Sequence, residues 1–129
     1  MSQVEGNSCV AHYRKTDGTP QSGEEHLRGV SELAAVFAGK IGIATLGKVA
    51  GLLHDLGKFS AAFQAYIAHP DSGGQDAESC ATRPRRGEID HSTAGAQFCW
   101  RPEPASYSLA RHLAQQILAL CLASHHSGL

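Results

Sequence analysis

The chain has 129 residues, of which 42% are hydrophobic and 18% are charged, and its formal net charge is −1. This length suits one domain with a single core, and the near-neutral charge lacks the basic excess that is common in nucleic-acid-binding domains. Apolar runs are far shorter than the roughly 20 residues of a membrane-spanning helix, and residues 1–19 lack the apolar centre of a signal peptide. We therefore expect one cytoplasmic domain over residues 1–129, with no membrane partner.

Five helices are predicted, and no strand pattern is convincing. Residues 1–21 are polar and are expected to be irregular. Ser22 with Glu25 forms a capping-box pattern that begins the first helix, which is expected to run to about Ala38, before Gly39. Apolar spacing, caps and prolines predict the other helices over residues 44–56, 60–68, 91–100 and 105–124. The predicted fold class is all-α.

Apolar side chains recur at helical spacing, which is typical of helices that bury one face. They are Leu27, Val30, Leu33, Ala34 and Phe37 on the first helix, and Leu109, Leu113, Ile117, Leu120 and Cys121 on the last. Phe63 and Tyr66 are expected in the core. The four cysteines, Cys9, Cys80, Cys99 and Cys121, form no C-x-x-C pair, so free thiols are expected and a zinc ribbon is disfavoured. Cys99 and Cys121 are predicted to be small core residues.

Residues 71–88 are rich in Gly, Ser, Asp, Arg and Pro and are predicted to form a long surface loop. Arg83, Arg85 and Arg86 cluster within it. The simplest interpretation of this cluster is a solvated loop, and the alternative is a contact with a DNA backbone.

Histidine is the compositional outlier, with eight in the chain. Four settings stand out because each lies near a predicted helix terminus, where distant segments can converge: His26, His54-Asp55, His91 after Asp90, and His125-His126. Imidazole and carboxylate ligands suit Mn, Fe, Co, Ni or Zn. The absence of cysteine from all four settings favours an open catalytic metal site over a closed structural one.

Asp55 has a capability that the histidines lack, because a carboxylate can bridge two metal ions. Two bridged ions can clamp and polarise a phosphodiester. Consecutive helical residues diverge by roughly 100°, so His54 and Asp55 are expected to face different sides of such a centre. Lys58 lies one turn further on, where its charge can neutralise a phosphoryl oxygen.

Simpler interpretations stand beside each of these assignments. His26 alone reads as a first-turn histidine, and His54-Asp55 as a hydrogen-bonded pair at a helix end. Asp90 is fully explained as an N-cap, so only His91 of that pair is a predicted ligand. The remaining alternatives are a frayed helix end for His125-His126 and a solvated side chain for Lys58. His12, His69 and His112 have no motif around them and are expected at the surface.

These motifs, taken in order, resemble a known family. His26, the run from Gly51 to Lys58, Asp90-His91-Ser92-x-x-Gly95-Ala96 and His125-His126-x-Gly128-Leu129 are similar to the successive motifs of the CRISPR-associated HD nuclease. This is the HD domain of the type I interference nuclease-helicase, within the HD phosphohydrolase superfamily. The resemblance covers residues 25–129 and implies an HD-domain helical bundle.

The resemblance also implies a function. The family members are metal-dependent nucleases that degrade DNA, chiefly single-stranded DNA opened by the type I CRISPR surveillance complex, and they act with a superfamily 2 helicase domain, fused or separate. Up to two divalent ions are implied, Mn, Co, Ni or Fe, with Mg as an alternative. His26, His54 and Asp55 correspond to ligands of the first ion, and Asp55, His91, His125 and His126 to ligands of the second. Asp55 and Lys58 correspond to the catalytic residues.

One departure from the family pattern concerns the first ion. In the family, a later aspartate completes that site, whereas this chain ends at Leu129, and Asp71, Asp76 and Asp90 come too early to replace it. Either the chain is a fragment of a longer protein and the helical bundle is truncated, which is the interpretation we favour, or the first metal site is incomplete. The first ion is expected to be weakly held or missing, while the residues of the second site still converge.

Two other functions are compatible with the same residues. One is an HD phosphohydrolase that acts on small nucleotides, which needs a closed pocket with base-specific groups. The other is a catalytically inactive HD fragment that serves as a docking module for a helicase or surveillance complex.

Overall fold

The computed structural model describes residues 9–68, 89–101, 104 and 106–126. The elements in chain order are two strands, β1 (Val10–Tyr13) and β2 (Pro20–Ser22), the helices α1 (Gly23–Gly39) and α2 (Ala44–Leu53), a 3-10 helix η1 (Leu56–Phe59), and the helices α3 (Ala61–Ile67), α4 (Thr93–Cys99) and α5 (Leu109–Ser124). The predicted all-α class is confirmed, since the only sheet among these residues is a two-stranded hairpin.

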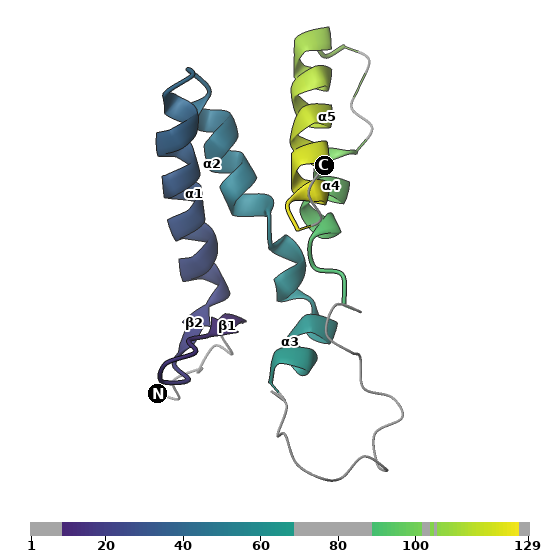
Figure 1. The fold of residues 1–129 in the computed structure, drawn as a ribbon. Coiled ribbons are helices and arrows are strands. Elements are labelled where there is room, and N and C mark those ends of the chain that lie inside the picture. The colour runs from purple at the N-terminus through teal and green to yellow at the C-terminus, as the bar shows by residue number, and fades with distance from the viewer. Residues whose placement is uncertain (1–8, 69–88, 102–103, 105, 127–129) are drawn as a thin grey trace, which may run out of the picture.

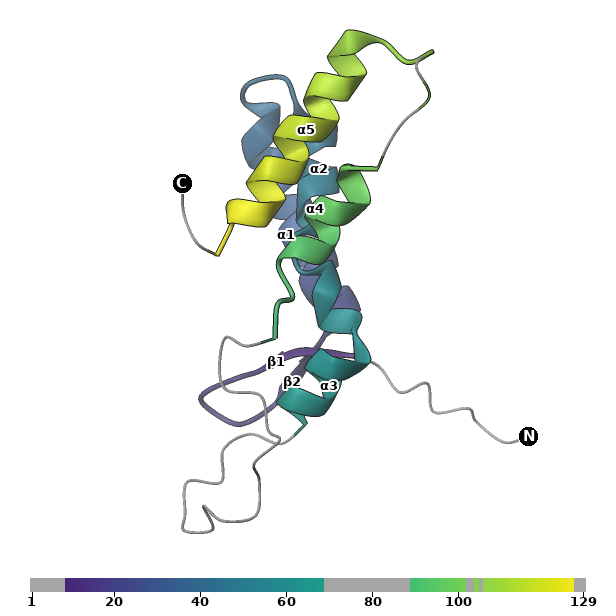
Figure 2. The same cartoon turned by 90° about the vertical axis from the view of Figure 1, so that its right-hand side faces the viewer.

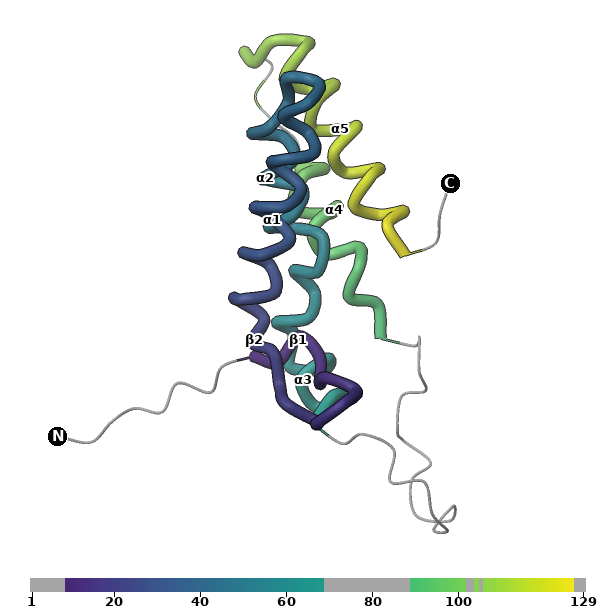
Figure 3. Tube along the Cα trace, turned by 60° about the vertical axis from the view of Figure 1, so that its left-hand side comes forward, coloured from purple at the N-terminus to yellow at the C-terminus, as the bar shows by residue number. Residues whose placement is uncertain are grey.

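The helices pack as two antiparallel pairs. Figure 1 shows α1 and α2 side by side, and α4 beside α5, while Figure 2 shows that α2 lies next to the second pair. The tube in Figure 3 shows the hairpin and α3 together at the end of this bundle where α1 begins. This arrangement brings the start of α1, the end of α2 and the end of α5 toward one region.

The hydrophobic core lies between α2, α4 and α5. Its buried members are Ala96, Cys99, Leu118, Ala119 and Leu122, and Leu46, Ala50 and Leu53 pack against them. The prediction that the apolar stripe of α5 is buried is wrong, because Leu109, Leu113, Ile117 and Leu120 are exposed. On α1, Leu27 is buried as expected, whereas Leu33 and Phe37 are exposed. Helical spacing identifies apolar positions, but the face of α5 that is buried against α2 and α4 carries Leu118, Ala119 and Leu122.

The contact between α1 and α2 depends on glycine. A Cβ at Gly51 would overlap the backbone of Ser31, and a Cβ at Gly47 would lie 2.6 Å from the Ala34 carbonyl oxygen. Ser31 is itself fully buried, and its hydroxyl donates to the Lys48 carbonyl at 2.9 Å. The two backbones therefore meet directly, with no side chain between them.

The hairpin corrects the expectation that residues 1–21 are irregular. Its strands pair antiparallel, with Tyr13 opposite Pro20, and Gly18 in the connecting turn has a positive φ of 70°. Pro20 and Gln21 have little intrinsic preference for strands. The pairing instead depends on contacts that sequence patterns do not show, because the Gln64 side chain bonds both backbone groups of Val10.

The predicted helix starts agree well where a capping side chain marks them. The capping box of Ser22 and Glu25 is present, with Ser22 Oγ accepting from the Glu25 N–H at 3.1 Å. Ser60 caps α3 in the same way. The last helix begins at Leu109 rather than near Ala105, because Ser108 provides the cap.

The end of α2 differs from the prediction in a way that shapes the site. The helix ends at Leu53 instead of Leu56, and Asp55 adopts non-helical angles (φ −115°, ψ 27°) before η1 begins. Gly57 in η1 lies so close to the His91 backbone that a Cβ there would overlap it. The chain therefore breaks at Asp55 and brings η1 against the segment that carries His91.

Cys9, Cys99 and Cys121 are free thiols, as predicted, and Cys80 lies outside the described residues. Cys99 is a buried core residue, and burial raises the pKa of its thiol. Cys121 is exposed, so its assignment to the core is wrong. Phe63 is buried as expected, and Tyr66 is partly buried.

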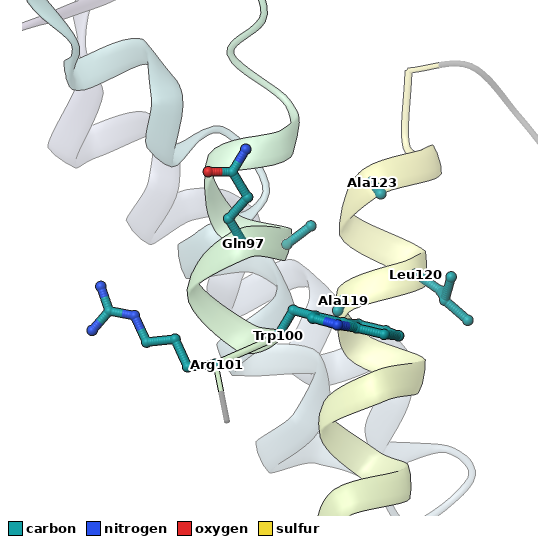
Figure 4. Close-up of a pocket in the computed structure, with 7 residues that line it drawn as sticks. Gln97, Trp100, Arg101, Ala119, Leu120 and Ala123 are labelled. Atoms are coloured by element: carbon teal, nitrogen blue, oxygen red, sulfur yellow. The ribbon is translucent and has the colours of Figure 1, made fainter. Parts of the chain in front are cut away.

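An apolar hollow lies between α4 and α5. Figure 4 shows the indole of Trp100 reaching from α4 across to α5 near Ala119 and Leu120, while Arg101 points the other way.

In the described part of the chain, the helices are too short or too polar to cross a membrane.

Candidate metal centre

Asp55 lies at the centre of the histidine cluster. Its side chain is only 4% exposed, and its two carboxylate oxygens face different partners. Oδ2 is 3.0 Å from His26 Nε2, 3.2 Å from His54 Nε2 and 2.8 Å from Lys58 Nζ.

The other oxygen faces the second group of histidines. Oδ1 is 3.3 Å from His125 Nε2, 3.4 Å from His126 Nε2 and 4.0 Å from His91 Nε2. His91 and His126 also approach each other, with their Nε2 atoms 3.2 Å apart. The structure thus brings together all the histidines that the sequence selects, and divides them between the two oxygens of one carboxylate.

Each histidine comes from a helix terminus or from the residues just outside one. His26 lies in the first turn of α1, and His54 is the C-cap of α2. His91 precedes α4, and His125 and His126 follow the last turn of α5. Because Asp55 sits at the break between α2 and η1, its carboxylate is placed by backbone geometry rather than by helical periodicity. The expected 100° divergence from His54 therefore does not describe how this pair is arranged.

Backbone carbonyls set the orientation of three imidazoles. His54 Nδ1 lies 2.8 Å from the Gly51 carbonyl, His125 Nδ1 lies 2.6 Å from that of Leu122, and His91 Nδ1 lies 3.3 Å from that of Ile89. A carbonyl only accepts, so in each case Nδ1–H is the donor. This leaves Nε2 toward the cluster, which is how metal-binding histidines are commonly held.

The cluster perturbs the acidity of its own members. Burial disfavours the Asp55 carboxylate, but hydrogen bonds from His54 and Lys58 and the charges of both outweigh it and hold the pKa of Asp55 far below its usual range. Burial lowers the pKa of His26, despite the opposing hydrogen bond to Asp55. Burial and the nearby His125 lower the pKa of His126. Asp55 is therefore an anion, and both imidazoles favour the neutral form that binds metals.

His54 shifts the other way. Burial alone lowers its pKa, but hydrogen bonds with Asp55 and with the Gly51 carbonyl outweigh this and raise it. A cation and a proton compete for Nε2 of His54, so metal binding at this position weakens as the pH falls, and the raised pKa of His54 strengthens this competition.

The donor atoms fit divalent cations. Two groups have all their donor atoms within 4.8 Å of one another: His26, His54 and Asp55 form one, and Asp55, His125 and His126 form the other. A carboxylate surrounded by imidazole nitrogens matches the ligand preference of first-row transition metals. Lys58, by contrast, is paired directly with Asp55, and its side chain is 14% exposed.

Asp90 lies two residues before the N-cap of α4, so its prediction as the N-cap is wrong: that position is held by Ser92, which makes no side-chain cap hydrogen bond. Asp90 Oδ1 accepts from the N–H groups of Ser92 and Thr93 at 2.9 and 3.1 Å, and its Oδ2 accepts from the Thr93 hydroxyl. The hydrogen bond from the Thr93 side chain, with the others, lowers the pKa of Asp90 to about 2.

Changing Asp90 to alanine is expected to lower the free energy of unfolding by about 1 kcal/mol, because the N–H groups of Ser92 and Thr93 lose their acceptor. Because the pKa of Asp90 is below its ordinary value, this stabilisation is present above about pH 4 and is lost as the pH falls toward 2. Urea unfolding of chelator-treated protein at pH 7 and pH 2.5 checks both points. An equal difference between the wild-type and alanine forms at the two pH values would contradict the stabilising role of the Asp90 carboxylate.

His12 is the neighbour that the sequence does not single out. It is exposed, as expected, but its ring centroid lies 5.6 Å from that of His26, at an interplanar angle of 87°. No sequence pattern predicts that His12 lies beside His26, because the β1–β2 hairpin is what brings the two rings together. His112 is at the surface, and His69, Arg83, Arg85 and Arg86 lie outside the described residues.

A family model described as "Cas3, HD domain" matches residues 25–128, which is most of the chain and includes every predicted site residue. No curated protein and no solved structure gives a significant match.

Proposed function

Since the chain belongs to the family of Cas3 HD domains, whose members have a metal-dependent nuclease role in type I CRISPR systems, we propose that it cleaves single-stranded DNA at a centre of two divalent ions. The observation that supports this most is the division of the Asp55 carboxylate, with Oδ2 toward His26 and His54 and Oδ1 toward His125 and His126. A carboxylate between two sets of imidazoles is the arrangement that a bridging ligand requires.

The proposed ligands follow from the same contacts. His26, His54 and Asp55 would hold one ion, and Asp55, His91, His125 and His126 the other. When bound, such ions neutralise charge on a phosphodiester and lower the pKa of a water molecule. The protein's contribution is to fix the imidazoles through the Gly51, Ile89 and Leu122 carbonyls, so that the donor atoms are already in place when a substrate arrives.

Lys58 is proposed to act on the substrate phosphate. In the described structure its Nζ is 2.8 Å from Asp55 Oδ2, so its charge is held at the centre of the site. A cation bound by Asp55 would compete for the same oxygen and leave the ammonium group to pair with a phosphoryl oxygen. The surveillance complex and a helicase domain, fused or separate, are the proposed partners that would supply the strand.

The test is cleavage of a labelled single-stranded oligonucleotide with Mn, Co, Ni, Mg or Zn added. Duplex DNA, a nucleoside monophosphate and a cyclic nucleotide serve as competing substrates. We expect cleavage of the single strand, activation by at least one transition metal, and loss of activity in a chelator. Hydrolysis of the small nucleotides alone would instead favour the phosphohydrolase, and binding of a helicase without any cleavage would favour a docking module.

Changing Lys58 to methionine is expected to lower kcat about 10²- to 10³-fold, as when one electrostatic stabiliser of a transition state is lost. The matched control is Lys40→Met, since Lys40 lies over the Phe37 ring at the far end of α1. Single-turnover cleavage at saturating metal separates the two variants. Equal rates for Lys58→Met and the control would remove Lys58 from the catalytic residues.

The two ions are expected to bind unequally. The group at Oδ1 has one more imidazole than the group at Oδ2. Losing a residue that only hydrogen-bonds to a metal ligand already lowers metal affinity about 10- to 100-fold, so a missing ligand should lower it at least as much. Calorimetric titration with Mn²⁺ should therefore show a tight step followed by a weaker one, with His91→Ala affecting the tight step. Two equally tight steps would contradict this order.

A further inference from the structure

We propose that the β1–β2 hairpin is the wall of the metal centre along which the DNA strand lies, with His12 and Arg14 contacting phosphates that flank the cleaved bond. This inference rests on the proposed nuclease function. In this arrangement, His12 and Arg14 join the substrate-binding residues, and the strand passes from the metal centre along the hairpin on the side of His26.

The position of His12 is the first observation. Its ring packs edge-on against His26, a proposed ligand whose Nε2 lies 3.0 Å from Asp55. Among the described residues, His12 does not belong to either group of converging donor atoms. It is therefore next to the centre without being part of it, and its exposed imidazole is available to a bound substrate.

The second observation is that the hairpin is fixed to the centre. Gln64 Oε1 accepts from the Val10 N–H at 2.9 Å, and Gln64 Nε2 donates to the carbonyls of Val10 at 2.9 Å and Lys58 at 2.7 Å. One half-buried amide thus joins β1 to the segment that carries Lys58. The N–H of Gly23 also donates to the Cys9 carbonyl at 2.6 Å, which ties the hairpin to the start of α1.

The third observation is an irregularity in the strand pairing. The register shifts between Val10 and His12, and Ala11 between them is 2% exposed. Such bulges turn a strand locally and redirect the following side chain. Here the Ala11 side chain is buried, and the exposed His12 ring lies against His26.

The chemistry of the adjoining surface suits phosphate. A hollow beside His12 is lined by Arg14, Thr19, Pro20, Gln21 and Glu25. The carboxylate of Glu25 is already used, because it accepts from the Ser22 N–H in the capping box. Arg14 is paired with Asp17 at 3.0 Å, but both side chains are largely exposed, and such pairs contribute little and exchange readily. His12 and Arg14 are therefore the side chains of this hollow that are proposed to meet a phosphate, while the Glu25 carboxylate is held at the helix start.

The experiment measures binding of a fluorescent oligothymidine by anisotropy, with the full chain in a chelator so that the strand is not cut. Arg14→Ala should weaken binding about 5- to 10-fold and reduce the slope of log K against log salt by about 0.7, the value for one single-strand phosphate. Arg28→Ala is the matched control, because Arg28 is also exposed and paired with an acidic neighbour, Glu24, but lines a different hollow, with Leu52 and Phe59.

His12→Ala should weaken binding of the strand about 3- to 5-fold while leaving Mn²⁺ affinity unchanged, with His112→Ala, a partly exposed histidine of α5, as the control. Wild-type binding and salt slope in both His12→Ala and Arg14→Ala, with cleavage by the wild type intact, would overturn the inference and leave the nuclease function standing. A loss of Mn²⁺ affinity in His12→Ala would also overturn it, since His12 would then be a ligand. A wild type that neither binds nor cuts the strand would remove both the inference and the function.

Discussion

Replacing Asp55 with asparagine is expected to reduce metal-dependent DNA cleavage by about 10³-fold or more, equivalent to ~4 kcal/mol of lost transition-state stabilisation. The side chain keeps its size and part of its hydrogen bonding, but it loses the charge that faces both groups of histidines. Because each group depends on one oxygen of the same carboxylate, affinity for both ions should fall together. Cleavage assays and Mn²⁺ titrations of the same preparation measure the two effects.

The control for this change is Glu32→Gln, which converts an exposed carboxylate on α1 to an amide and should leave both measurements unaltered. Thermal unfolding in a chelator shows whether the Asp55 variant is folded. A folded Asp55→Asn protein that still cuts DNA within tenfold of the wild type would end the proposal of a bridging carboxylate.

Replacing Gly51 with alanine is expected to lower the free energy of unfolding by about 3 kcal/mol, at the upper end of the cost of overpacking. The added methyl group meets the Ser31 backbone, which cannot move aside as a flexible side chain can. Separating α1 from α2 also moves His26 relative to His54, so metal affinity should fall with stability. Urea denaturation with and without Mn²⁺ measures both.

Gly29→Ala is the matched control on α1. An added Cβ at Gly29 meets nothing within 4 Å, and the position is exposed. In a helix interior this change should raise the free energy of unfolding by about 0.5–1 kcal/mol. The prediction is therefore a difference in sign between two glycine-to-alanine changes on adjoining helices. A destabilisation of less than about 1 kcal/mol at Gly51 would mean that the helices separate at little cost.

What the sequence predicts well is local. The capping box at Ser22 and the cap at Ser60 each depend on a residue three positions away, and both are found in the structure. The predicted N-cap Asp90 is the exception, since Ser92 holds that position. The helix-terminal histidines are also recognisable, because their order along the chain matches a family pattern. Both kinds of feature depend on residues that are close in the sequence or on the order of motifs, so a single sequence is enough to predict them.

What the sequence misses depends on contacts between distant segments. The break at Asp55 accompanies the close approach of Gly57 to His91, 34 positions along the chain. The hairpin depends on Gln64, which is 54 positions from Val10. The choice of Leu118 and Leu122 over Leu113 and Ile117 as buried residues is made by α4. No periodicity reports such contacts, and so His12 could not be placed beside His26 from its sequence context.

The convergence of Asp55 with the start of α1, the end of α2 and the end of α5 has a consequence for thermodynamics. The described core has few large buried side chains, so apolar packing contributes only part of the free energy that keeps these segments together. A ligand that binds only the folded chain adds RT ln(1 + [L]/Kd) to its stability, about 2.7 kcal/mol at 100 times Kd. The melting temperature should therefore rise with the logarithm of free Mn²⁺ concentration, and this dependence would report the occupancy of the centre without any substrate.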